Sequence, residues 1–280
     1  MDRIYNATRT KKIMVEYDLT MKKSLGQNFL VDGNIVKKIV DGAGLQKDDI
    51  VLEVGPGIGS LTEEVLLRGN SATSIEIDSR FYPILRENFQ RFNNFKLVEG
   101  DALNDEVWKE ANEKPTPNVF VGNLPYVITT PLLEKIFTSD NKFKTAVVMV
   151  QKEVADRMTA GPGSKTYGAL SVFVSFFSNA KTLFTVSESS FIPRPKVKSA
   201  VVKMELKAPE VDGKKFMKFV HIAFNMRRKT LLNSVSKGMD LDKKESLKMI
   251  TNCGIDPDVR AETLELKSFL RLYENFKQFL

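Results

Sequence analysis

Five short runs of apolar, mostly β-branched residues recur through the first 150 residues, and helix-like stretches separate them. The runs occupy residues 50–54, 72–77, 95–99, 118–122 and 145–150. Strands that alternate with helices form βαβ units, and the strands of such units pair in parallel. The pattern therefore predicts an α/β fold built on a mostly parallel sheet.

The pattern changes in the last third of the chain. Two more strand-like runs, at residues 181–186 and 199–206, have no helix between them. We expect them to form an antiparallel hairpin at one edge of the sheet. Only helical patterns follow. We therefore predict an α/β domain over residues 1–207 and a small all-helical domain over residues 208–280. Residues 1–24 form a basic extension whose conformation, mobile or helical, stays open.

Composition limits where the protein can be located and which kinds of partner it can have. No apolar run approaches the ~20 residues needed to cross a bilayer. The first residues lack the apolar segment of a secretory signal. Cys253 is the only cysteine, which excludes an internal disulfide and a cysteine-rich metal site. We therefore expect a cytoplasmic protein with no membrane partner and no metal. A monomer is the simplest expectation, but composition does not give the oligomeric state.

Charge is distributed unevenly along the chain, whose net charge is +7. Residues 41–110 carry 14 acidic and 7 basic side chains, whereas residues 214–237 carry 7 basic side chains and no acidic one. This asymmetry favours a polyanion bound on one side, although a solvated helix face is the alternative. The candidate contacts are Arg194 and Lys196, and a predicted helical segment with Arg227, Arg228 and Lys229.

A glycine turn lies between the first predicted strand and the next helix. The stretch EVGPGIGSLTEEV places Gly55, Gly57 and Gly59 at this junction. Glycine lets the backbone turn tightly and approach a ligand closely, and the helix that follows offers free N–H groups. The spacing is G-x-G-x-G rather than the G-x-G-x-x-G of dinucleotide-binding proteins. Alone, such a turn is a weak indication of a site.

Carboxylates end the next two strands. Glu76 lies 21 residues beyond Gly55, and Asp101 ends the third strand. A carboxylate at the second strand end can accept both hydroxyl hydrogens of a ribose, and Asp101 could accept from an adenine amino group. A helix N-cap is the alternative for Asp101. Together these residues predict a nucleoside-like ligand at the carboxyl edge of the sheet. The glycine spacing favours S-adenosylmethionine over NAD.

The fourth strand runs into Asn123, Leu124, Pro125 and Tyr126. The amine of adenine is a poor nucleophile, and accepting both of its hydrogens would aim its lone pair at a methyl donor. The Asn123 side chain and the Leu124 carbonyl offer those acceptors, Pro125 stiffens the turn, and Tyr126 can stack on the base. An ordinary turn at a strand end is the alternative.

These stretches are long and chemically unusual, and the chain resembles the bacterial small-subunit rRNA adenine dimethyltransferases over nearly its whole length. The similarity includes KKSLGQNFLVD, EVGPGIGSLT, GNLPYVITTPLL, QKEVADRMTAGPGSKTYGALSV, FIPRPKVKSAVV and FNMRRKTLLN. The resemblance implies a class I methyltransferase fold, Rossmann-like with a seven-stranded sheet, and a small helical C-terminal domain. It implies transfer of methyl groups from S-adenosylmethionine to two adjacent adenosines in the 3′-terminal hairpin loop of 16S rRNA. The substrate would be the small ribosomal subunit or its precursor.

The resemblance also assigns roles to single residues. It places the donor against Asn28, Leu30, Gly55, Glu76, Asp101 and Asn123. It places Phe191 opposite Tyr126, across an extruded base.

Other functions stay open at this point. The large-subunit rRNA adenine methyltransferases of macrolide resistance share the QNFL, glycine and N-x-P-aromatic motifs, but they match the QKEVADRM…GSKTYGALSV block less well. A second alternative is a non-catalytic RNA-binding assembly factor, against which the intact donor and NLPY residues argue. A DNA adenine methyltransferase would more usually carry a second proline after Asn123. The glycine spacing disfavours a dehydrogenase.

Overall fold

The computed structural model describes residues 3–20, 27–125, 128–139, 143–226 and 228–280. Contacts divide the chain into two compact units. The first comprises Met1–Ala155 and Lys181–Leu206, and the second comprises Asp156–Ala180 and Lys207–Leu280. Among the described residues, no helix has both the length and the apolar character needed to cross a membrane.

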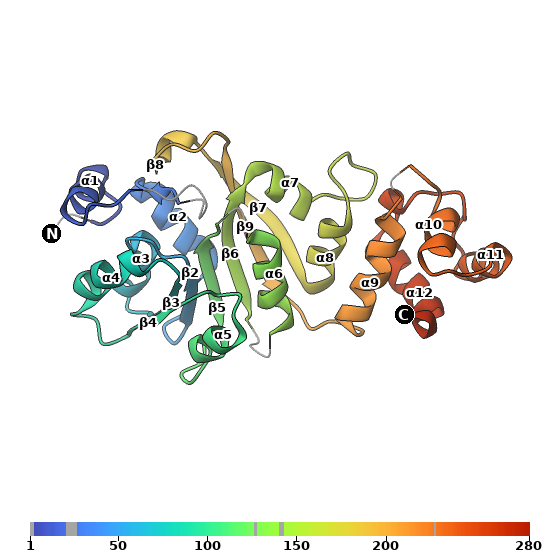
Figure 1. Ribbon diagram of the computed structural model, residues 1–280, viewed down its shortest axis with the longest axis horizontal. Helices are drawn as coiled ribbons and strands as arrows, with labels where there is room; N and C mark the ends of the chain where they lie inside the picture. The colour runs from blue at the N-terminus through green and yellow to red at the C-terminus, as the bar shows by residue number, and fades with distance from the viewer. Residues whose placement is uncertain (1–2, 21–26, 126–127, 140–142, 227) are drawn as a thin grey trace. The chain divides into compact units, whose positions relative to one another are not determined.

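A seven-stranded sheet organises the first unit (Figure 1). Its strands are β2 (Ile50–Val54), β3 (Ser71–Glu76), β4 (Phe95–Glu99), β5 (Val119–Asn123), β6 (Thr145–Gln151), β7 (Ser178–Val186) and β9 (Ser199–Leu206). They lie in the order β4-β3-β2-β5-β6-β9-β7. The pairs among β2 to β6 are parallel, and β9 is antiparallel to β6. The predicted parallel sheet with an antiparallel edge is therefore confirmed, and its first five strands lie within one residue of the predicted runs.

The sheet grows in both directions from β2. β3 and β4 follow on one side, and β5 and β6 follow on the other. Where the strand order of an open parallel sheet reverses in this way, a crevice forms outside the carboxyl ends of the strands. The ends of β2, β3 and β5 therefore mark the expected place for a ligand.

Helices connect the strands because their apolar residues recur at helical spacing and capping residues mark their ends. In α2 (Gly33–Ala43), the buried residues are Val36 and those three, four and seven positions later. The Asp32 carboxylate accepts hydrogen bonds from the first N–H groups of this helix, and Gly44 ends it in the left-handed region. The other connecting helices are α3 (Ser60–Leu67), α4 (Tyr82–Phe89), α5 (Asp105–Ala111), α6 (Thr129–Thr138) and α7 (Lys152–Met158).

The N-terminal extension is packed against the first unit. It forms α1 (Ala7–Glu16), and Ile4, Ile13 and Leu19 are buried in the same apolar core as residues of the sheet. The Ile4 N–H donates to the Glu63 carboxylate in α3 at 2.8 Å. Of the two conformations left open by the sequence, the helical one is therefore present in α1. Residues 21–24 of the predicted extension lie outside the described residues.

A second, two-stranded sheet joins segments that are distant in the sequence. β1 (Phe29–Leu30) pairs antiparallel with β8 (Phe191–Ile192), and Leu30 lies opposite Phe191. The Val31 N–H extends the contact by donating to the Ser190 carbonyl at 2.8 Å. Two residues are too few for alternation to be recognised, so this sheet was not predicted. It fixes the stretch that leads into α2.

The second unit is built mainly from helices. They are α8 (Ala169–Phe177), α9 (Gly213–Phe224), α10 (Leu231–Gly238), α11 (Lys243–Asn252) and α12 (Leu266–Phe276). Phe176 stacks on Phe216 with 4.4 Å between ring centroids, and Phe219 stacks on Phe276 at 5.7 Å. Because Phe176 belongs to this aromatic core, residues 156–180 join the C-terminal helices. The predicted division instead assigned every residue up to 207 to the first domain.

Arg228 and Lys229, which the sequence predicted to be helical, lie in a turn between α9 and α10, and the helix begins only at Leu231. The Thr230 side chain accepts from the Asn233 N–H at 3.4 Å and caps the start of α10. This cap places the start of α10 after the basic residues rather than at them. Arg228 and Lys229 are exposed in the turn, and Arg227 lies outside the described residues.

Candidate active site

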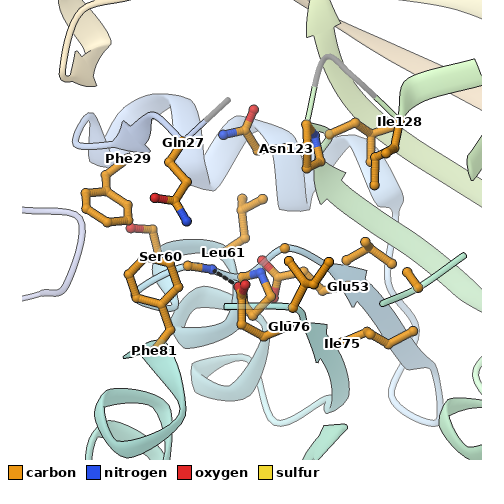
Figure 2. Close-up of a pocket in the computed structure, with 18 of the residues that line it drawn as sticks. Gln27, Phe29, Glu53, Ser60, Leu61, Ile75, Glu76, Phe81, Asn123 and Ile128 are labelled. Atoms are coloured by element: carbon orange, nitrogen blue, oxygen red, sulfur yellow. Dashed lines mark hydrogen bonds between the residues drawn. The ribbon is translucent and has the colours of Figure 1, made fainter. Parts of the chain in front are cut away.

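A cavity of about 260 Å³ lies at the carboxyl ends of β2, β3 and β5 (Figure 2). Nine predicted residues are among those that line it: Asn28, Leu30, Gly55, Gly57, Glu76, Asp101, Asn123, Leu124 and Pro125. In Figure 2, Asn123 and Glu76 project toward the cavity from opposite sides. Folding therefore gathers residues from five separate stretches of the chain around one space, at the place that the strand order predicts.

The glycine turn brings its backbone against the end of β3. Gly57 has a φ of +57°, and its N–H donates to Glu76 Oε2 at 3.0 Å. Gly59 has a φ of +95°, and a Cβ there would lie 2.5 Å from the Phe89 ring. Both positions therefore require glycine, the first to aim an N–H group and the second to let α4 approach. The turn offers main-chain atoms to the cavity without side chains in front of them.

Backbone N–H groups anchor both carboxylate oxygens of Glu76, which is 3% exposed. Oε1 accepts from the Asp78 N–H at 2.9 Å, and Oε2 accepts from the Gly57 N–H. Burial raises the pKa of Glu76 to about 7, although these two N–H groups act in the opposite direction. Each carboxylate oxygen can accept another hydrogen bond. The ionised group therefore fits the pair of hydroxyls on a ribose.

Asp101 lies at the rim of the cavity, beyond the end of β4. Its Oδ1 accepts from the Leu103 N–H at 2.9 Å, which shapes the turn. The N-cap of α5 is Asn104, so the alternative reading of Asp101 as the helix N-cap was wrong. Oδ2 has no protein partner among the described residues. This oxygen is therefore available to an amino group on a ligand.

The N-terminal segment orients the Asn123 side chain at the end of β5. Asn123 Nδ2 donates to the Asn28 carbonyl at 3.3 Å. The amide donor is therefore used within the protein, and Oδ1 is left as an acceptor beside the cavity. Asn28 contributes here through its main chain, which sequence reasoning had no means to specify.

The turn after Asn123 is held by its own main chain. The Leu124 N–H donates to the Met149 carbonyl on β6 at 3.0 Å. The Pro125 carbonyl accepts from the Ile128 N–H at 3.2 Å and from the Thr129 hydroxyl at the same distance. These bonds hold the main chain of Leu124 and the Pro125 carbonyl in place before any ligand binds. Tyr126, the last residue of the NLPY motif, lies outside the described residues.

This arrangement of a strand-end carboxylate, a glycine turn and a strand-end Asn-Leu-Pro agrees with a comparison of the whole chain. A family model described as "Ribosomal RNA adenine dimethylase" matches residues 18–278. The chain belongs to the ribosomal RNA adenine dimethylase family. Full-length relatives agree with this assignment.

Two of these relatives carry the name "Ribosomal RNA small subunit methyltransferase A". The protein of Clostridium botulinum (strain ATCC 19397) is 43% identical over 267 residues, covering 94% of this chain and 96% of the relative. The protein of Alkaliphilus oremlandii is 43% identical over 287 aligned residues, covering both chains completely.

Solved structures of similar proteins share the fold of this dimethylase-family chain. A dimethyladenosine transferase from Plasmodium falciparum superposes with a TM-score of 0.77 at 29% identity, over 89% of this chain and 97% of the relative. The 23S rRNA methyltransferase ErmE superposes with a TM-score of 0.68 at 26% identity, over 89% of this chain and all of the relative. The predicted class, a Rossmann-like methyltransferase fold with C-terminal helices, is confirmed.

Phe191 does not reach the cavity of this dimethylase-family chain. Its side chain is 2% exposed and belongs to the apolar core, and it is not among the residues that line the cavity. Tyr126 lies outside the described residues, so the predicted position of Phe191 opposite Tyr126 stays a prediction. As part of β8, the residue pairs with β1.

Glu53 is a cavity residue that sequence reasoning missed. It is 3% exposed, and its Oε2 accepts from the hydroxyls of Thr62 at 2.5 Å and Ser74 at 3.3 Å. Burial raises the pKa of Glu53 to about 7, and the charge of the neighbouring Glu76 adds to this effect. A carboxylate within the otherwise apolar run IVLEV, directly before the glycine turn, was the signal that could have revealed it.

The predicted RNA-binding residues that the structure describes lie outside the cavity lining. Arg194 and Lys196 are exposed in the loop between β8 and β9, in the first unit. Arg228 and Lys229 are exposed in the turn between α9 and α10, in the second unit. Within the described part of the chain, no group of three or more His, Cys, Asp or Glu side chains could hold a metal ion.

Proposed function

We propose that the chain transfers methyl groups from S-adenosylmethionine to the exocyclic amines of two adjacent adenosines in the 3′-terminal hairpin loop of 16S rRNA. The proposed product is dimethyladenosine, formed in the cytoplasm on the small ribosomal subunit or its precursor, by a monomer. The observation that carries the proposal is the convergence of Glu76, Asp101 and Asn123 on one cavity. The 43% identical relatives named as small-subunit methyltransferases support the choice of substrate.

The chemistry of the cavity fits the proposed donor. Glu76 would accept the ribose hydroxyls, Asp101 Oδ2 would accept from the adenine amino group, and Gly55 and Gly57 leave room for close approach. Asn28, Leu30 and Asn123 would complete the wall around the donor. When bound, S-adenosylmethionine supplies an electrophilic methyl group on a positively charged sulfur. When ionised, the buried carboxylates Glu53 and Glu76 would give the cavity the negative charge that suits a cation.

The turn at the end of β5 would orient the target amine. Asn123 Oδ1 and the Leu124 carbonyl would accept its two hydrogens and leave the nitrogen lone pair directed at the donor methyl group. Asn123 Nδ2 is already bound to Asn28, and the Leu124 main chain is already bound to Met149, so these acceptors need little reorganisation. Acceleration would therefore come from orientation and electrostatic preorganisation rather than from a general base.

The site must also admit an amine that already carries one methyl group. That amine has a single hydrogen, so one of the two acceptors would be unused in the second transfer. Tyr126, for which the proposal rests on the sequence alone, would stack on the base drawn out of its loop. Arg194, Lys196 and the segment with Arg227, Arg228 and Lys229 would contact rRNA phosphates.

The decisive experiment supplies labelled S-adenosylmethionine to the full chain, together with small subunits that lack the modification. The label is then mapped by nuclease digestion and mass spectrometry. We expect dimethyladenosine at two adjacent positions in the 3′-terminal loop of 16S rRNA, formed much more slowly with Asn123→Ala. Large subunits serve as the parallel substrate, because the ErmE relative is named as a 23S rRNA methyltransferase.

Each alternative predicts a different outcome of this experiment. Label in 23S rRNA alone would replace the proposal with the macrolide-resistance type of activity. Binding to small subunits without label in any RNA would indicate a non-catalytic assembly factor.

A further inference from the structure

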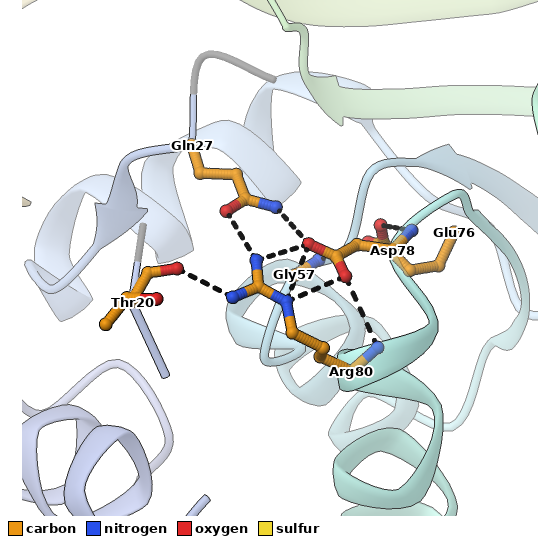
Figure 3. Close-up of polar contacts among 6 residues, drawn as sticks. All are labelled: Thr20, Gln27, Gly57, Glu76, Asp78 and Arg80. Atoms are coloured by element: carbon orange, nitrogen blue, oxygen red, sulfur yellow. Dashed lines mark hydrogen bonds and ion pairs between the residues drawn. The ribbon is translucent and has the colours of Figure 1, made fainter. Parts of the chain in front are cut away.

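An arginine–aspartate pair lies behind the cavity, directly after the end of β3 (Figure 3). Arg80 Nε donates to both carboxylate oxygens of Asp78, at 2.9 and 3.2 Å, and Arg80 Nη2 donates to Asp78 Oδ2 at 2.6 Å. The Asp78 side chain is 1% exposed and that of Arg80 is 28% exposed. Neither residue lines the cavity. The proposed function therefore leaves this buried ion pair without a role.

The pair extends to the N-terminal segment at two points. Arg80 Nη1 donates to the Thr20 carbonyl at 2.7 Å. Gln27 Nε2 donates to Asp78 Oδ2 at 2.8 Å, and Gln27 Oε1 accepts from Arg80 Nη2 at 3.4 Å. Figure 3 shows Thr20 and Gln27 on either side of the Arg80 guanidinium group. An ion pair that stabilised only the turn at residues 78–80 would not need contacts to Thr20 and Gln27.

Each member of this network stands next to a residue of the proposed site. The Asp78 N–H donates to Glu76 Oε1 at 2.9 Å. Gln27 lines the cavity and precedes Asn28, whose carbonyl receives the Asn123 amide. The network therefore links the carboxylate at the end of β3 to the amide at the end of β5, through the N-terminal segment.

An apolar contact joins the same two segments independently. Phe29, from the N-terminal segment, meets Phe81 edge to face with 5.7 Å between ring centroids. Both rings line the cavity. Residues 27–30 and 78–81 therefore form one continuous wall, with the ion pair on its outer side and the cavity on its inner side.

We propose that Asp78 and Arg80 are positioning residues that hold Gln27 and Asn28 against the cavity, so that the donor wall and the Asn123 amide are in place before the donor binds. This inference rests on the proposed function, because it takes the cavity as the donor site. The wall begins at Gln27 and Asn28, the two described residues directly before Phe29, which belong to no regular strand or helix. Without the pair, donor binding would have to order these residues, and this entropic cost would weaken the affinity for the donor.

Arg80 is the residue to change, and the chain offers a closely matched control. Arg68 also donates to carboxylates, those of Asp41 and Glu64, and to a main-chain carbonyl, that of Lys37. Its side chain is 30% exposed, close to the 28% of Arg80, but it does not line the cavity. Arg68→Gln therefore removes a similar set of guanidinium hydrogen bonds from a residue outside the cavity lining.

The measurement is calorimetric titration of the full chain with S-adenosylmethionine and, separately, S-adenosylhomocysteine. We expect Arg80→Gln to weaken both affinities about tenfold, the scale of one lost charged hydrogen bond. Arg68→Gln should bind like wild type, with a similar loss of thermal stability in the two variants. Equal affinities for Arg80→Gln and Arg68→Gln would overturn the inference. Failure of the wild type to bind either compound would instead overturn the proposed function itself.

A double-mutant cycle separates positioning from general stabilisation. Gln27→Ala cuts the link between the pair and the wall but keeps the Asp78–Arg80 contacts, so it is also informative if Arg80→Gln folds poorly. If Arg80 acts through Gln27, the double variant should bind the donor about as weakly as the weaker single variant. If the fold-losses in affinity of the two single variants multiply in the double variant, the two residues act independently, and the inference would be overturned.

Discussion

The Asn123 amide donates to the Asn28 carbonyl, a residue that lies 95 positions earlier in the chain. This bond decides which end of the amide faces the cavity. Because Nδ2 is bound to the main chain of the N-terminal segment, Oδ1 is presented as an acceptor for the target amine. The bond also makes the proposed catalytic turn dependent on a segment that belongs to the donor wall.

Asn123→Ala should slow methyl transfer far more than it weakens binding of the small subunit. The contact between Oδ1 and the amine strengthens as the nitrogen develops positive charge in the transition state, so its loss lowers kcat rather than affinity. We expect the single-turnover rate at saturating substrate to fall by about 10²-fold or more, which is the scale of a lost preorganised contact. Equal single-turnover rates for the variant and wild type would show that Asn123 has no role in the chemistry.

Glu76→Ala should weaken donor binding by roughly 1.5–3 kcal/mol, the range for hydrogen bonds to a charged group. Glu99 offers a matched control, since it lies opposite Glu76 in the pairing of β3 with β4 but is exposed and outside the cavity lining. Calorimetry on both variants, with thermal unfolding as a check of folding, measures the difference. Unchanged affinity in a folded Glu76→Ala protein would rule out the ribose contact.

Glu53→Gln should change how stability depends on pH. Burial raises the pKa of Glu53 to about 7, whereas its ordinary value is 4.5. Between these values the folded chain holds more protons than the unfolded chain, so the free energy of unfolding decreases as the pH rises from about 4.5 through about 7. The amide cannot ionise. We therefore expect the variant to gain stability relative to wild type between pH 5 and pH 8, on the order of 3 kcal/mol.

Denaturant titrations of both proteins at pH 5 and pH 8 test this expectation. Glu76 is unchanged in both proteins, so its own titration contributes to each and largely cancels in the comparison. A stability difference between Glu53→Gln and wild type that is the same at both pH values would contradict the raised pKa of Glu53.

Ile13→Ala should destabilise the chain if α1 is part of the core. Ile13 is 6% exposed, whereas Val15, two residues later on the same helix, is 82% exposed. We expect a loss of about 2–4 kcal/mol in the free energy of unfolding for Ile13→Ala, and a change within about 0.5 kcal/mol for Val15→Ala. Denaturant titration measures both. Equal, small effects would mean that the extension is not packed on the first unit in solution.

Replacing Arg228 and Lys229 together by Gln should reduce the salt dependence of binding to small subunits. Each lost phosphate contact lowers the slope of log affinity against log salt by roughly 0.7–0.9, so we expect a decrease of about 1.5. Lys243 and Lys244 provide the control, because they are equally exposed in the same unit but are flanked by Asp242 and Glu245. A wild-type slope in the Arg228/Lys229 variant would move the expected RNA contact to Arg194 and Lys196.

Short-range signals explain what could be predicted. The first five strand runs were located within one residue because β-branched clusters and the residues that flank them are local features. The positions of Gly57, Glu76 and Asn123 at strand ends followed from the same runs, and parallel strands bring their carboxyl ends to one edge of the sheet. The helix predicted to include Arg228 begins only after Thr230, because the Thr230 side chain caps it, and this local feature was overlooked.

Other features of the fold depend on contacts between distant parts of the chain. Pairing of β8 with β1 places the Phe191 ring in the core, whereas its predicted position opposite Tyr126 stays a prediction because Tyr126 lies outside the described residues. Residues 156–180 precede the predicted boundary, yet Phe176 stacks on Phe216 in the second unit. The sequence of β8, or of residues 156–180, contains no pattern that identifies the distant segment with which it packs.

The sequence by itself therefore determined the parallel sheet, the glycine turn and the set of polar side chains at the strand ends, because spacing along a strand or helix decides them. Only the tertiary structure decided how those side chains are used. The Asn28 carbonyl orients Asn123, and the Asp78–Arg80 pair holds Gln27, through bonds that span 95 and about 50 residues of chain. Such contacts depend on the sum of packing interactions across the whole unit. No local propensity encodes them.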